Sequence, residues 1–189
     1  MPLSDGGAWL HTPNVWSPVR VQNGYAHGTQ RELSRNGYDD SYAYLSGNWA
    51  PNQTIQGVVQ RNPGDPRDAS MEVLLMLRVS DDSNNVRGYE CLFNYYGGAD
   101  LVRWSGPYGG WKSLSFTRGG TALGRHLQTG DVLKCRIQGN TITSWVNDKL
   151  MAEAVDSQIT SGAPGIGFFT RPGAGDQWLT LTSVTATSD

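Results

Sequence analysis

Apolar residues along this chain recur mainly at every second position, which is the period of a β-strand that buries one face. In the segment 71–79 the alternating apolar positions are Met71, Val73, Leu75, Leu77 and Val79. A comparable pattern recurs in 89–96, 133–137, 141–146, 164–169 and 177–186. No segment sustains the 3.6-residue period of an amphipathic helix. The pattern therefore predicts a protein built of strands.

Turn sequences separate these strands. The segments 80–85 and 97–98 are rich in Asp, Asn, Ser or Gly, and both Gly139 and Asn140 tolerate the positive φ of a tight hairpin. Consecutive hairpins without crossover helices predict an all-β fold, an antiparallel β-sandwich closed as a jelly roll. Because strands of the same kind flank the Pro/Gly-rich stretch 62–68, we expect a single domain over 1–189.

The amino-acid composition limits the kinds of molecule that this protein is expected to bind. The 24 glycines among 189 residues fit many turns, and a chain of this length buries about 70% of its unfolded surface, enough for a core without metal or disulfides. Fifteen Lys and Arg against 17 acids give a net charge of −2, which argues against a nucleic-acid partner. No stretch approaches the ~20 apolar residues of a membrane span, so we expect no membrane insertion. The first ten residues also lack the regions of a signal peptide.

The two cysteines, Cys91 and Cys135, occupy apolar-side positions on two predicted strands. They are 44 positions apart and form no C-x-x-C pair, so a zinc site is not supported. One disulfide and two buried thiols both remain open, and neither fixes the compartment.

The segment 130–169 contains a Gly-Asp-x-Leu opening, an apolar strand, a Gly-Asn turn and a strand that ends in Val-Asn. It continues with Asp-Ser-x-x-x-Ser-Gly-x-Pro-Gly-Ile-Gly. This order of motifs resembles the C-terminal half of concanavalin A-like, laminin-G-like jelly rolls, although Asp148 stands where the family pattern has glycine. The stretches 101–114 and 4–9 are similar to a hairpin and to the first strand of bacterial members. The resemblance implies the fold but leaves the function open, because this superfamily includes lectins, binding modules, glycanases, lyases and structural domains.

Catalytic motifs of such folds are matched poorly. Glycosidases of the laminarinase type carry several carboxylates on one strand, whereas Glu72 and Glu90 each stand alone on theirs. The stretch 30–35 is faintly similar to an alginate-lyase motif, but its Gln-x-His partner is missing. We therefore predict that the protein is not an enzyme, with a polysaccharide hydrolase or lyase as the third hypothesis.

Aromatic and polar residues point instead to sugar binding. If Ile142 and Val146 face the core, Trp145 faces outward beside Thr143. Sugar rings present apolar C–H faces, so an indole with neighbouring donors suits them. The predicted ligand-binding residues are Trp145, Thr143, Lys134, Arg136, Trp49, Trp104, Tyr108 and Trp111. The leading hypothesis is a non-catalytic, lectin-like domain that binds an oligo- or polysaccharide on its concave sheet. Alternatively, outward aromatics only cover a sheet, and Trp104 or Trp111 caps the core.

The resemblance further implies one structural Ca²⁺, with Asp5 and Asp176 at the matching places, unless both are only turn formers beside glycine. The second hypothesis is a structural or adhesion domain without a sugar site, within a cell-surface or phage virion assembly. Both non-catalytic hypotheses place the protein outside the cell, on its surface or on a virion.

Overall fold

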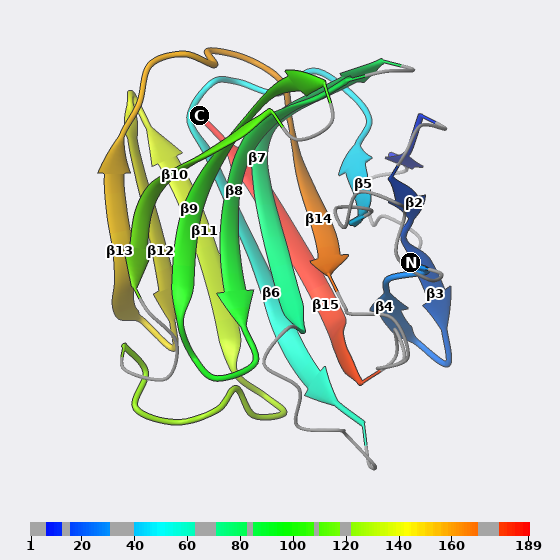
Figure 1. Cartoon of the computed structure of the whole chain (residues 1–189). Coiled ribbons are helices and arrows are strands. Elements are labelled where there is room, and N and C mark those ends of the chain that lie inside the picture. Colours follow the sequence, from blue (N-terminus) through cyan, green and yellow to red (C-terminus); the bar gives the residue numbers. More distant parts are fainter. Residues whose placement is uncertain are drawn as a thin grey trace.

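Two sheets packed face to face make up the described part of the chain in this computed structural model (Figure 1). The structure describes residues 7–12, 16–30, 40–62, 71–82, 85–107, 110–117, 122–169 and 178–189. The eight-stranded sheet contains, in spatial order, β1 (Trp9–Leu10), β5 (Ser41–Leu45), β14 (Ala163–Phe169), β7 (Glu72–Asp82), β8 (Asn85–Asn94), β9 (Ala99–Pro107) and β10 (Trp111–Thr117), with β2 (Ser17–Pro18) paired to β5. The seven-stranded sheet contains β13 (Lys149–Val155), β12 (Thr141–Val146), β11 (Val132–Gln138), β6 (Gln53–Arg61), β15 (Leu179–Ser188), β4 (Tyr25–His27) and β3 (Arg20–Gln22).

The predicted antiparallel β-sandwich is confirmed. Every pairing between strands is antiparallel except that of β2 with β5, and the described residues contain no helix. No helix long and apolar enough to cross a membrane therefore occurs in the described ranges. Figure 1 shows the long strands β7, β8 and β9 side by side, with the short N-terminal strands gathered at one edge of the sandwich.

The core lies between the two sheets. Leu75 of β7 and Cys91 of β8 face it from one sheet, and Leu133 of β11 and Ile142 of β12 face it from the other; all four are fully buried. The cysteines left open by the sequence are joined as a disulfide, Cys91–Cys135, with 5.9 Å between the Cα atoms. Because β8 and β11 belong to different sheets, this bond links the two layers covalently.

One predicted facing is wrong. Val79 packs not with Leu75 and Leu77 but with Leu74 on the opposite side of the eight-stranded sheet. The register of β7 against β8 shifts between Leu77 and Ser80, and Arg78 adopts a φ of 51°. A β-bulge of this kind inserts one residue into the strand and reverses the faces that follow it.

Among the longer strands, β5 and β6 were not predicted from the sequence pattern, and neither were the short strands β2, β3 and β4. In β6 the inward position between Ile55 and Val59 is Gly57, which contributes no side chain to the apolar face. A Cβ at Gly57 would lie 3.0 Å from a methyl group of Leu181, so β15 fills the space that an apolar residue would take. The inward and outward positions of β6 therefore alternate in the structure, but the glycine interrupts the apolar pattern in the sequence.

The motif residue Asp131 has a structural role. Its carboxylate accepts two hydrogen bonds from the Arg125 guanidinium, at 2.8 and 2.7 Å, and others from the Gln128 backbone N–H and the Asn147 amide. Burial opposes the charge, but these donors outweigh it and lower the pKa of Asp131. Asp148 takes the left-handed conformation, with a φ of 61°, so the tight turn survives the departure from glycine.

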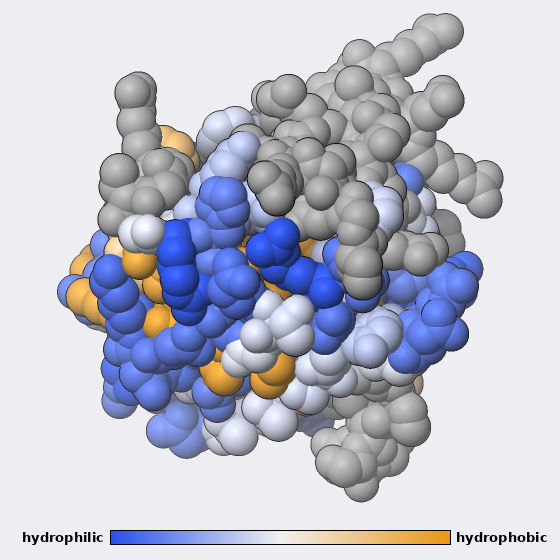
Figure 2. All heavy atoms as spheres, turned by 90° about the horizontal axis from the view of Figure 1, so that it is seen from below, coloured by the Kyte–Doolittle hydropathy of each residue, from blue (hydrophilic) through white to orange (hydrophobic). Residues whose placement is uncertain are grey.

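Figure 2 views the sandwich from below the orientation of Figure 1. Its described residues are mostly hydrophilic, with hydrophobic ones in small separate patches. Among the described residues visible in this view, no hydrophobic patch has the extent expected of a broad apolar docking face.

Candidate binding site

A second hydrophobic cluster covers the outer face of the eight-stranded sheet, the face turned away from the core. Its buried residues are Trp16, Tyr42, Leu74, Met76, Val79, Val86, Val102 and Trp104. Trp16, which precedes β2, lies at 90° to the Tyr42 ring and at 80° to the Trp104 ring, with centroids 5.5 and 4.6 Å apart. The N-terminal segment thus covers part of this face.

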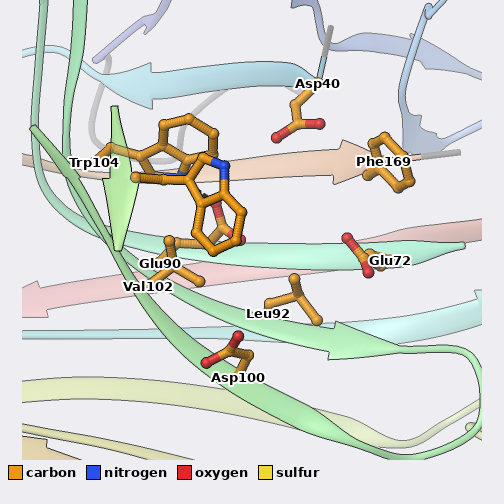
Figure 3. Close-up of a pocket in the computed structure, with 9 residues that line it drawn as sticks. Asp40, Glu72, Glu90, Leu92, Asp100, Val102, Trp104 and Phe169 are labelled. Carbon is orange, nitrogen blue, oxygen red and sulfur yellow. Dashed lines mark hydrogen bonds between the residues drawn. The ribbon is translucent and has the colours of Figure 1, made fainter. Parts of the chain in front are cut away.

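A cavity of about 230 Å³ opens beside this cluster (Figure 3). It is lined by Asp40, Glu72, Glu90, Leu92, Asp100, Val102, Trp104, Trp111 and Phe169. The lining combines four carboxyl groups with aromatic and aliphatic side chains. Such a mixture of apolar walls and a few polar groups is typical of ligand sites.

Strand register explains how the lining is assembled. Leu92 of β8 lies opposite Asp100 of β9, and the next outward pair along these strands is Glu90 with Val102. One step further, Trp104 lies opposite Trp111 of β10. Because alternate residues share one face, this ladder places carboxyl groups and aromatic rings from neighbouring strands around Leu92.

Two of the carboxyl groups are fixed by hydrogen bonds. The Trp104 indole N–H donates to Glu90 Oε2 at 2.6 Å, and the Ser113 hydroxyl of β10 donates to Asp100 Oδ1 at 2.8 Å. Within the described ranges the Glu72 carboxyl group makes no hydrogen bond. Figure 3 shows its carboxyl group beside Leu92, with Asp40 extending toward the same space.

Burial raises the pKa of three of these carboxyl groups. It raises the pKa of Glu72 to about 8, with a further contribution from the charges of Glu90 and Asp100. Burial also raises the pKa of Glu90, although the bond from Trp104 opposes this, and it raises that of Asp100 against the bond from Ser113. At neutral pH the cavity therefore offers both a protonated carboxyl donor and carboxylate acceptors.

The aromatic walls differ in exposure. Trp104 is 5% exposed, whereas Trp111, directly opposite it on β10, is 42% exposed. Phe169 at the end of β14 is half-buried. A ligand in the cavity would thus meet one indole that is fixed by packing and one that faces solvent.

Four of the predicted ligand residues lie on the outer face of the seven-stranded sheet, away from this cavity. Trp145, Lys134 and Arg136 lie together on the outer face of the seven-stranded sheet, as their predicted facing requires. The Lys134 Nζ lies 4.9 Å from the Trp145 ring centroid, and the Arg136 Cζ lies 5.5 Å from it. Cations thus already contact this indole. Thr143 shares the face, is 5% exposed, and donates a 3.5 Å hydrogen bond to Glu153.

The other predicted residues are scattered. Trp104 and Trp111 line the cavity on the eight-stranded sheet, whereas the Trp49 indole donates to the Ser46 carbonyl in a separate hollow. Tyr108 and both proposed calcium ligands, Asp5 and Asp176, lie outside the described residues. Within the described ranges no group of three or more His, Cys, Asp or Glu side chains is arranged to hold a metal ion.

Sequence analysis missed the acidic character of the site. It treated Glu72 and Glu90 as isolated carboxylates and did not consider Asp40 or Asp100. The available signal was that Glu72, Glu90 and Asp100 all occupy the non-core positions of their strands. Their convergence depends on strand register and on the covering N-terminal segment, which no local pattern encodes.

Comparison with solved structures shows which known proteins have a similar fold. No protein-family model and no curated protein sequence matches the chain. Among solved structures, the carbohydrate-binding module CBM66 from Bacillus subtilis is similar over 97% of this chain and 96% of its own, with a TM-score of 0.67 and 16% identity. The VIP36 exoplasmic/lumenal domain, in a form bound to Ca²⁺ and Man, covers 97% and 83%, with a TM-score of 0.60 and 8% identity. An alginate lyase from Pseudomonas aeruginosa covers 90% and 86%, with a TM-score of 0.56 and 12% identity.

Identities this low establish the fold and nothing finer. The chain is an all-β sandwich of the concanavalin A-like jelly-roll type, as the sequence motifs predicted. Both binding proteins and an enzyme share it, so function has to be argued from the site.

Proposed function

We propose that this protein is a non-catalytic carbohydrate-binding domain whose sugar site is the cavity on the outer face of the eight-stranded sheet. The observation that carries the proposal is the joint presence of Trp104, Trp111 and several carboxyl groups around one hollow. Indole rings pack against the C–H faces of a pyranose, and carboxyl groups bind its hydroxyls. Similarity to a carbohydrate-binding module over nearly the whole chain supports the same reading.

The cavity is small. Its volume of about 230 Å³ is below the ~300–1,000 Å³ of sites for drug-sized ligands, so it suits one sugar unit of a chain. A site of this size fits an affinity in the micromolar to millimolar range, about −8 to −4 kcal/mol.

Two tryptophans on opposite sheets provide the test. A glycan array identifies a ligand, and its affinity is then measured by calorimetry for Trp111→Ala and for the control Trp145→Ala. Each substitution removes a partly exposed indole from an outer face. We expect Trp111→Ala to weaken binding at least tenfold, about 1.4 kcal/mol, and Trp145→Ala to leave it within twofold. The reverse result would move the site to the Trp145 face predicted from the sequence.

A glycan array on which the protein binds no glycan would overturn the proposal. The structural or adhesion domain of a surface or virion assembly would then become the leading hypothesis, and a stable oligomer in solution would favour it.

The raised pKa values of Glu72 and Glu90 favour a second candidate, a polysaccharide hydrolase or lyase. Carboxyl groups with shifted pKa values in a cleft are frequent at catalytic sites. Release of reducing ends or of unsaturated products from a polysaccharide panel, lost in Glu72→Gln, would establish catalysis in place of simple binding.

The fully buried Cys91–Cys135 bond supports an oxidising location outside the cytoplasm, as a surface glycan would require. Thiol labelling of protein taken directly from its source organism tests this: the expected result is no reactive cysteine after denaturation without reductant.

A further inference from the structure

The lining of the cavity carries charge of one sign only. Asp40, Glu72, Glu90 and Asp100 contribute carboxyl groups, and the described lining contains no Lys, Arg or His. The remaining lining residues are aliphatic or aromatic. Whatever binds here meets an acidic, partly apolar surface.

Some carboxyl oxygens of the cavity have no hydrogen-bond donor within the described part of the protein. Glu90 is 2% exposed, and the structure gives a partner to its Oε2 atom but none to Oε1. The Glu72 carboxyl group makes no hydrogen bond within the described ranges. Neither Glu90 Oε1 nor the Glu72 carboxyl oxygens are sealed from solvent, so they remain available to a donor that enters the cavity.

The elements around the cavity contribute no compensating cation to its described lining. Glu72 comes from β7, Glu90 from β8 and Asp100 from β9, whereas β10 contributes the Ser113 hydroxyl and β14 contributes Phe169. Asp40 immediately precedes β5. The cationic residues of β7 to β10 that lie outside the lining are Arg78, Arg87, Arg103 and Lys112. Arg78 instead binds backbone carbonyls, and Arg103 binds Asp156.

We propose that the cavity selects a sugar unit that carries a protonated amine, such as glucosamine, and disfavours uronic and sulfated sugars. This inference rests on the proposed carbohydrate-binding function. An ammonium group supplies several donors to the carboxylates, and the indoles of Trp104 and Trp111 add cation–π attraction. A uronate or sulfate group would instead add a further negative charge among carboxyl groups that already repel one another.

Proton release distinguishes this selection from ordinary hydrogen bonding. A bound cation stabilises the ionised carboxylates, so it displaces the proton that Glu72 retains in the empty cavity. A neutral sugar exerts no such pull. Binding of the amine should therefore release protons, and binding of neutral sugars should not.

The probes are a glucosamine tetramer, its fully N-acetylated counterpart, cellotetraose and a uronate tetramer. Calorimetry at about pH 6, below the raised pKa of Glu72, is run in buffers of different ionisation enthalpy. We expect the glucosamine tetramer to bind at least tenfold more tightly than the N-acetylated one, with a net release of protons from Glu72 and Glu90. The preference should shrink as salt rises from about 0.1 to 1 M, because screening weakens it.

Glu72→Gln is the decisive variant, and Glu153→Gln on the other sheet is its matched control. Glu72→Gln should weaken the amine preference and reduce the proton release, whereas Glu153→Gln should leave both at the wild-type level. Equal affinities for amine and N-acetyl probes, a preference for the uronate probe, or an amine preference and proton release that Glu72→Gln leaves unchanged would overturn the inference. Under those results, binding of a neutral sugar lost in Trp111→Ala would leave the carbohydrate-binding function standing. If no sugar binds in the probe set or on the array, the function itself fails.

Discussion

The indole N–H of Trp104 donates a 2.6 Å hydrogen bond to Glu90 Oε2 across two neighbouring strands. In the register of β8 with β9, Trp104 lies opposite Gly88, so Glu90 is its diagonal neighbour on the same face. Both side chains are almost fully buried, at 5% and 2% exposure. One bond therefore positions an aromatic wall of the cavity and one of its acidic groups together.

Trp104→Phe keeps a ring in this place but removes the donor. We expect it to destabilise the fold by about 1–3 kcal/mol, because a buried acceptor loses its partner, and to raise the pKa of Glu90 further. Urea unfolding near neutral pH measures the cost. Trp145→Phe, whose indole is half-exposed, serves as the control and should change stability by less than about 0.5 kcal/mol. Equal midpoints for the two variants would refute this role of the bond.

Stability should fall as pH rises. The folded protein holds the Glu72 proton up to about pH 8, whereas the unfolded chain releases it near the ordinary value of 4.5. The stability contributed by this group is therefore complete below about pH 4.5 and is lost progressively up to about pH 8. Each unit of pKa shift corresponds to about 1.4 kcal/mol, and we expect a loss of at least that amount.

Glu72→Gln removes this titration and should make the pH profile of chemical unfolding between pH 5 and 9 less steep, while Glu153→Gln should follow the wild type. The raised pKa of Glu90 should leave a smaller slope in Glu72→Gln. A Glu72→Gln profile as steep as the wild-type profile would mean that other groups cause the dependence.

Core-facing and outward positions should differ sharply. Leu75 is fully buried between the sheets, so Leu75→Ala should cost about 2–5 kcal/mol through lost apolar contact and a new cavity. Arg136 is exposed beside Trp145, and Arg136→Ala should stay near ±0.5 kcal/mol. Denaturant midpoints in the opposite order would contradict the facing of these strands.

The disulfide should contribute substantially to stability. Cys91 and Cys135 are 44 residues apart, and closing a loop of that length restricts the unfolded chain by about 4 kcal/mol in the chain-entropy model. The double variant Cys91→Ala with Cys135→Ala should unfold at a correspondingly lower denaturant concentration. Adding reductant during unfolding should then destabilise the wild type alone. An unchanged midpoint in the double variant would show that the two buried sulfurs stabilise only as apolar groups.

The sequence by itself determined the class of fold. The period-2 alternation in β11 and β12 and the turn at Gly139 require a hairpin with Ile142 inward and Trp145 outward, and both sides are found as predicted. These features are local, because side-chain direction in a strand depends only on the parity of the position. The same reasoning failed at Arg78, where a bulge reverses the parity without a sequence signal.

Only the tertiary structure decided where the candidate site lies. Glu72, Glu90 and Asp100 come from three strands, and each is an unremarkable outward residue when read alone. The strand register brings these three side chains around Leu92. Trp16 and the segment around it cover the neighbouring surface. Burial then raises the pKa values of the three carboxyl groups. Proximity between strands and exclusion of water are properties of the assembled sheet, so no pattern along one strand can reveal them.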